Sequence, residues 1–292
     1  MDDQEFMIEC MNDRFISRRE FGAAGAAAAG VTAAAGASAA NAATPKVVDE
    51  DVTIKTPDGT CDAAFVHPSS GSYPAVILWP DIVGLRPVKR EMAARLAAEG
   101  YSVLVPNPFY RSAKSPVFGP DFDFAKTEDR NKAFEMRKPL TEAAVMRDAT
   151  ALVAWLDKQK PVNKKKKVGT VGYCMGGPMT MQTAAAVPHR VGAGVSCHGG
   201  GLVTKDPDSP HLLIPKMKAA YHFAVASNDD AREPDSKTTL MAACDAVKLP
   251  ASLEVYAKAQ HGWCVPGSAV YDKAQADRAW AVMLALYKSR LV

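Results

Sequence analysis

The residues from 172 to 177, Gly-Tyr-Cys-Met-Gly-Gly, have the spacing of a turn that presents a nucleophilic cysteine. Cys174 follows an apolar run and precedes a helix-like stretch, so it would stand at the tip of a tight strand-to-helix turn. Gly172 and Gly176 lie two residues to either side, where Cβ atoms would collide across such a turn. The N-terminus of the following helix would direct its N–H groups at the sulfur and favour the reactive thiolate. A Gly-rich turn around a buried cysteine is the alternative interpretation.

A cysteine nucleophile needs a base, and the base needs a carboxylate that orients it. The chain supplies both in the order nucleophile, acid, histidine that accompanies turns of this kind. Asp229 follows a predicted strand, and His261 follows the last predicted strand. Both would lie at the carboxyl edge of the sheet, beside Cys174. Asp230 is the alternative acid, and His198 precedes the acid in the chain and is interpreted as structural.

Short, nearly continuous apolar runs bounded by Gly, Pro or charge predict the strands that position these residues. These runs cover residues 75–79, 102–106, 168–172, 193–197, 221–226 and 253–256. Before them, the alternating runs 52–55 and 63–66 enclose Asp58-Gly59, which predicts an N-terminal hairpin. Helical patterns cover residues 87–99, 141–158, 176–187, 235–247 and 272–290. The alternation predicts an α/β fold with a mostly parallel central sheet and helices on both faces.

Residues 107–138 interrupt this alternation with a stretch rich in Pro, Phe and charge. An irregular insertion of this length within a compact domain predicts a lid or a substrate wall. We see no internal repeat, so residues 43–292 are predicted to form a single domain.

The first 42 residues have the features of an export signal. Ser17-Arg18-Arg19-Glu20-Phe21 is a twin-arginine signature, and an Ala/Gly-rich stretch follows it. Ala37-Ser38-Ala39 and Ala40-Asn41-Ala42 offer cleavage sites. The Ala/Gly content is weakly apolar for a membrane span, so the mature form is predicted to have none. We expect the twin-arginine export machinery as a partner and a periplasmic or secreted location.

Composition excludes several other classes. The chain has 35 Lys and Arg against 32 Asp and Glu, a balance that gives no argument for nucleic-acid binding. It has six cysteines, and removal of the signal would remove Cys10 and leave five. An odd number in a chain of this length does not indicate a disulfide scaffold, and no C-x-x-C pair indicates a zinc site. We therefore predict no metal and no organic cofactor.

With these residues in place, the chain resembles the dienelactone hydrolase family of α/β-hydrolases, also called carboxymethylenebutenolidases. The resemblance spans about residues 53–291. It is carried by Pro80-Asp81-Ile82-Val83-Gly84 with the strand at 102–106, by the cysteine turn, and by His261-Gly262-Trp263. It implies the α/β-hydrolase fold, hydrolysis of an ester or lactone, and a triad of Cys174, Asp229 and His261.

The resemblance also implies roles for the residues after the first central strand. Asp81 occupies the place of an acid that faces the resting thiol, although the usual residue is glutamate, one methylene longer. The N–H groups of Ile82 and Met175 would form the oxyanion hole. Family members hold a substrate carboxylate with arginines, one of them shortly after the histidine, and this chain has none there. The insertion offers other cations: Arg111, Arg130, Lys132 and Arg137.

An anionic lactone and a neutral or aromatic ester therefore both remain candidate substrates. Thiolate chemistry suits activated esters, and a peptidase would need His261 to protonate a poor leaving group. Two other classes remain. One is a non-catalytic member of the fold that binds a small ligand. The other is a thiol-redox protein, in which Cys197 or Cys264 would resolve an oxidised Cys174.

Overall fold

The computed structural model describes residues 46–119, 121–124 and 126–292. The predicted export signal at residues 1–42 lies outside the described residues. Within the described part of the chain, no helix is both long and apolar enough to cross a membrane.

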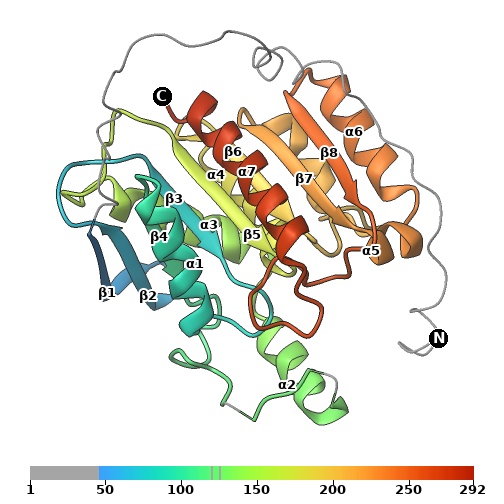
Figure 1. The fold of residues 1–292 in the computed structure, drawn as a ribbon, viewed down its shortest axis with the longest axis horizontal. Coiled ribbons are helices and arrows are strands. Elements are labelled where there is room, and N and C mark those ends of the chain that lie inside the picture. Colours follow the sequence, from blue (N-terminus) through green and yellow to red (C-terminus); the bar gives the residue numbers. More distant parts are fainter. Residues whose placement is uncertain (1–45, 120, 125) are drawn as a thin grey trace, which may run out of the picture.

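Eight strands form one sheet in the order β1-β2-β4-β3-β5-β6-β7-β8 (Figure 1). Their bounds are β1 Val47–Thr56, β2 Gly59–Pro68, β3 Ala75–Trp79, β4 Ser102–Pro106, β5 Val168–Tyr173, β6 Val191–Cys197, β7 Ala220–Ala226 and β8 Ala251–Tyr256. β2 pairs antiparallel with β1 and β4, and the pairs from β4 to β8 are parallel. The predicted fold class, with its N-terminal hairpin, is confirmed. The hairpin closes where Thr56 pairs with Gly59, whose φ of 144° a glycine adopts without strain.

Helices cover both faces of this sheet (Figure 1). On one face lie α1 (Pro87–Ala98) and α7 (Lys273–Arg290), which bury Met92, Leu96 and Met283 against the strands. On the other face lie α3 (Glu142–Leu156), α4 (Gly176–Ala186) and α6 (Ser236–Ala246). The central strands β3, β4 and β5 are buried at every position, which explains their continuous apolar runs.

The insertion at 107–138 is less irregular than predicted, because α2 (Thr127–Arg137) forms within it. Apolar periodicity gave no sign of this helix, since Ala133 is its one buried residue among those described. Two further short helices were not predicted. They are the 3₁₀ helix η2 (Pro210–Lys216) and α5 (Ser227–Arg232), which starts directly after β7.

The parallel strands end at a common edge of the sheet, and the candidate catalytic residues lie at this edge. Asp81 follows β3, Cys174 follows β5, and His198 follows β6. Asp229 lies in α5 just after β7, and His261 lies in the turn region after β8. Residues from five separate segments therefore meet at one end of the sheet.

Candidate active site

Cys174 occupies the tight turn between β5 and α4 and has a φ of 54°, which is unusual for a residue other than glycine. A Cβ on Gly172 would lie 1.9 Å from the carbonyl oxygen of Gly176, and a Cβ on Gly176 would lie 2.5 Å from that of Trp79. The two glycines are thus required by backbone contacts. The Cys174 side chain is only partly buried and lines the cavity at the sheet edge.

His261 is held from two sides. Its Nδ1–H donates to Oδ2 of Asp229 at 2.6 Å, and its backbone N–H donates to Oδ1 of Asn228 at 2.8 Å. Because Nδ1 carries this bond, Nε2 is the ring nitrogen left to act on Cys174. The adjacent Asp230 pairs instead with Lys237 at 2.7 Å. The geometry thus separates the two candidate acids, and Asp229 is the one that contacts the histidine.

The electrostatics of His261 favour its charged form. Burial lowers the pKa of the imidazole, but hydrogen bonds with Asp229 and Cys174, together with their negative charge, outweigh burial and raise the pKa to about 10. At neutral pH the ring therefore holds a proton beside the sulfur. A protonated imidazole next to a cysteine is a general way of favouring a nucleophilic sulfur.

His198 also contacts the nucleophile, and it does so through the main chain. Its Nδ1 accepts the backbone N–H of Cys174 at 3.1 Å, and its own φ is 40°. Its ring lies 5.0 Å from the ring of His261 and 5.1 Å from that of Trp263. Burial, with the charge of His261, lowers the pKa of His198 well below its ordinary value, so the ring is neutral. Its place after a parallel strand was the one sequence signal for this contact.

Asp81 lies in the same cavity as Cys174, and its carboxylate is paired with cations. Arg86 donates to both of its oxygens at 2.7 and 2.9 Å, and Lys89 Nζ lies 2.8 Å from Oδ2. The backbone N–H of Val83 adds a further bond at 3.0 Å. Burial acts to raise the pKa of Asp81, but the two cations outweigh it and hold the pKa well below its usual range. The carboxylate is therefore ionised and already engaged.

Lys89 is a residue that sequence reasoning missed. Its side chain has 0% exposure, which is rare for lysine. Lys89 lies on the buried face of α1 because Met92, Ala93 and Leu96 follow it at helical spacings of three, four and seven residues. A lysine in that helical register was the available signal.

A cavity of about 1070 Å³ opens around these groups. Ile82 and Met175, the predicted oxyanion-hole residues, line it, and Met175 stands at the start of α4. Phe124, Phe134 and Arg137 of the insertion form another part of its wall. The remaining cations named from the insertion are not among its lining residues. They are Arg130 and Lys132, both on α2, and Arg111, which is bound to Asp58 and Asp148.

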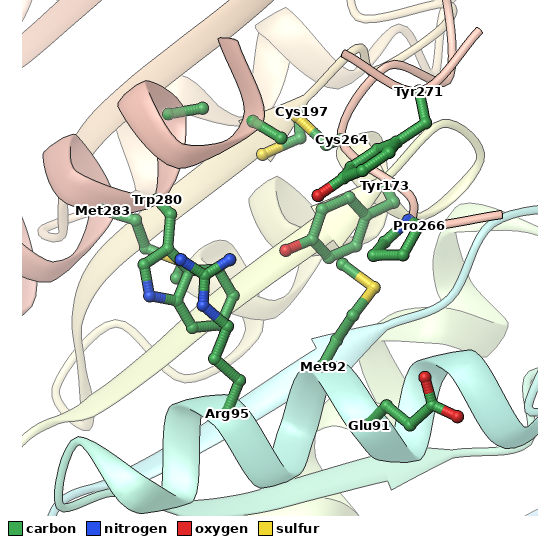
Figure 2. Close-up of a pocket in the computed structure, with 12 residues that line it drawn as sticks. Glu91, Met92, Arg95, Tyr173, Cys197, Cys264, Pro266, Tyr271, Trp280 and Met283 are labelled. Atoms are coloured by element: carbon green, nitrogen blue, oxygen red, sulfur yellow. The ribbon is translucent and has the colours of Figure 1, made fainter. Parts of the chain in front are cut away.

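A second cavity of about 210 Å³ lies behind Tyr173, between α1 and α7 (Figure 2). Cys197 and Cys264 both border it, and both are free cysteines. Burial and the neighbouring Cys197 raise the pKa of the Cys264 thiol well above its usual value. The two cysteines considered as redox partners for Cys174 thus line this second cavity and are not among the residues that line the cavity of Cys174.

No group of three or more His, Cys, Asp or Glu side chains is arranged to hold a metal ion within residues 46–119, 121–124 and 126–292.

Comparison with known proteins places this geometry in a family. A sequence model described as the dienelactone hydrolase family matches residues 61–291. A carboxymethylenebutenolidase of Rhodococcus opacus is 32% identical over 141 residues, which are 48% of this chain and 50% of that protein. A carboxymethylenebutenolidase of Pseudomonas putida is 27% identical over 184 residues, or 62% of this chain and 75% of that protein. The match therefore spans half of the first relative and three quarters of the second.

Solved structures agree on the fold. A dienelactone hydrolase-like promiscuous phosphotriesterase from metagenomic libraries superposes with a TM-score of 0.69 at 21% identity, covering 84% of this chain and 99% of that one. The dienelactone hydrolase of Anabaena variabilis gives a TM-score of 0.58 at 17% identity, with coverage of 84% and 99%.

Proposed function

The chain belongs to the dienelactone hydrolase family of hydrolases, and we propose that it cleaves ester or lactone bonds with Cys174 as the nucleophile. One observation carries the proposal. Cys174 stands on a strained turn and lines the same cavity as His261, and His261 is hydrogen-bonded to Asp229. A nucleophile beside a base that an acid orients is the signature of covalent catalysis.

In the first step of the proposed reaction, His261 holds the proton of Cys174 and the thiolate attacks the carbonyl carbon. The tetrahedral oxyanion accepts hydrogen bonds from the N–H groups of Ile82 and Met175. Each such donor is worth on the order of 3 kcal/mol of barrier. His261 then gives its proton to the departing alcohol oxygen, which leaves a thioester on Cys174.

In the second step, His261 takes a proton from water, and the resulting hydroxide attacks the thioester. The thiolate departs, the acid product is released, and His261 is again protonated beside the sulfur. Asp229 keeps the imidazole in the productive tautomer throughout.

The walls of the cavity support a substrate with an apolar or aromatic part. Phe124 and Phe134 are 39% and 44% exposed, and their rings meet edge to face at 5.8 Å. Arg86, Arg137 and Arg232 also line the cavity, so an anionic group on the substrate would find cations there. Activated esters and enol lactones, which release a good leaving group, are the proposed substrate class.

The test is hydrolysis of a panel of aryl esters and lactones by the full chain, compared with Cys174→Ala. We expect the variant to lose turnover by at least about a thousandfold, with an unchanged thermal melt. Trapping a thioester of the expected mass on Cys174 would identify the intermediate. Turnover equal to that of the parent in the Cys174→Ala protein would rule out this nucleophile.

We further propose export by the twin-arginine route, on the basis of Arg18 and Arg19 and the small-residue cleavage sites that follow. Fractionation of cells that express the full chain should recover a shortened protein outside the cytoplasm. Replacing both arginines with lysine should retain the full-length chain inside.

A further inference from the structure

The cluster formed by Asp81, Arg86 and Lys89 carries an unbalanced charge. One ionised carboxylate faces two cations, so the three side chains sum to one positive charge. Arginine remains charged throughout the working pH range. Burial lowers the pKa of Lys89, and the ion pair with Asp81 at 2.8 Å opposes that shift. An excess positive charge beneath a cavity favours an anion nearby.

Lys89 stands close to the nucleophile turn. Its Nζ lies 4.6 Å from the ring centre of Tyr173, the residue immediately before Cys174. The charge of Lys89 contributes to the lowered pKa of His198, whose ring accepts the backbone N–H of Cys174, and a negative charge on Cys174 acts to raise the pKa of Lys89. Because its side chain is fully buried, little water screens these interactions. Figure 2 shows the Tyr173 ring above α1, the helix that carries Lys89.

The cavity around Cys174 has other charged and titratable groups in its lining. They are His261 after β8, Asp229 and Arg232 on α5, the neutral His198 after β6, Arg137 at the end of α2, and Asp206. Asp229 is engaged by His261 and by Arg232, whose nitrogen lies 3.6 Å from Oδ1. The cation cluster is therefore a source of positive potential at the sulfur that is separate from the histidine.

We propose that Lys89 is a positioning residue that acts through its charge. Together with Arg86, it holds the Asp81 carboxylate in an ion-paired state and leaves one net positive charge that maintains Cys174 as a thiolate. The inference rests on the proposed function only in taking Cys174 as the reactive thiol. It assigns a purpose to a buried lysine that the hydrolytic scheme does not itself use.

The charge count makes a signed prediction for three variants. Lys89→Met lowers the cluster charge to zero, Asp81→Asn raises it to two, and the double variant restores it to one. The pH midpoint of Cys174 alkylation should rise by about one pH unit in Lys89→Met and fall in Asp81→Asn. In the double variant it should return close to that of the parent. If Lys89 has a purely structural role, its replacement should lower the melting temperature, and the alkylation midpoints of the variants should not follow the cluster charge.

The measurement is the rate of iodoacetamide alkylation of the full chain against pH, with mass spectrometry reading Cys174 specifically. A thermal melt and a circular dichroism spectrum of each variant show whether it is folded. Alkylation needs no ester, so it reports on the thiolate even if no substrate is turned over. The inference is supported if the pH midpoint of alkylation is lowest in Asp81→Asn, intermediate and equal in the parent and the double variant, and highest in Lys89→Met.

An unchanged midpoint in folded Lys89→Met would overturn the inference, as would a double variant that follows Lys89→Met. If neither Lys89 variant folds, Arg86→Gln supplies the test, because it also reduces the cluster charge to zero. A raised midpoint in Arg86→Gln supports the inference, and an unchanged one rejects it. If the parent hydrolyses no ester but the alkylation midpoints follow the predicted order, the proposed function is rejected and the inference about Lys89 is not.

Discussion

The backbone N–H of Cys174 donates to Nδ1 of His198 at 3.1 Å, so a second histidine holds the main chain of the nucleophile. An accepting Nδ1 requires the neutral ring with its proton on Nε2. The same N–H also lies 3.1 Å from the carbonyl oxygen of Cys197. The strained φ of Cys174 is therefore supported from the neighbouring strand, which fixes the direction of the sulfur.

Replacing His198 should weaken this support. His198→Phe removes the acceptor and should lower kcat/KM by about fivefold, since a lost hydrogen bond is worth roughly 1 kcal/mol. His198→Asn keeps an oxygen acceptor and tolerates the left-handed backbone at this position, so it should retain more activity. Steady-state kinetics on one aryl ester compare the two. Equal losses in both variants would show that the acceptor does not matter.

The two neighbouring acids should differ sharply in their effect on turnover. Asp229→Asn removes the carboxylate that holds Nδ1–H of His261, and kcat should fall by about a thousandfold or more. Asp230→Asn breaks only the pair with Lys237 and is the matched control, with kcat expected within a few fold of the parent. Comparable losses in both variants would contradict the assignment of the triad acid.

Stability should depend on pH through His261. Its folded pKa of about 10 is above the ordinary 6.5 of an unfolded histidine. The stabilisation is therefore complete below about pH 6.5 and is lost as the pH rises through 10. Urea unfolding of the parent and of His261→Gln should give free energies that converge across this window. A difference that grows with pH would have the wrong sign.

The turn itself should not accept a methyl group. Gly172→Ala would place Cβ 1.9 Å from a backbone oxygen, so the backbone must shift. We expect the free energy of unfolding to fall by about 3 kcal/mol and hydrolysis to be lost. Gly119→Ala, with open space around its Cβ, is the control and should leave both unchanged. Thermal melts and aryl-ester assays measure the two effects.

The sequence by itself determined the turn, the order of the candidate triad and the fold class. The turn is recognisable because its sterics are local: Gly172 and Gly176 relieve contacts made within a few residues of Cys174. The parallel strands are recognisable because burial on both faces demands continuous apolar runs. The helix α2 was not predicted because it buries almost no side chains, so its sequence lacks the apolar periodicity of a helix.

Only the tertiary structure decided which partners the charged and polar side chains take. Asp229 and Asp230 are adjacent in sequence, yet the turn of α5 sends one to His261 and the other to Lys237. Asp81 binds Arg86 and Lys89 because the chain between β3 and α1 turns so that the start of α1 faces this carboxylate. His198 contacts Cys174 because β5 and β6 are neighbours in the sheet. Such contacts depend on distance and direction in the folded chain, which spacing along the sequence does not encode.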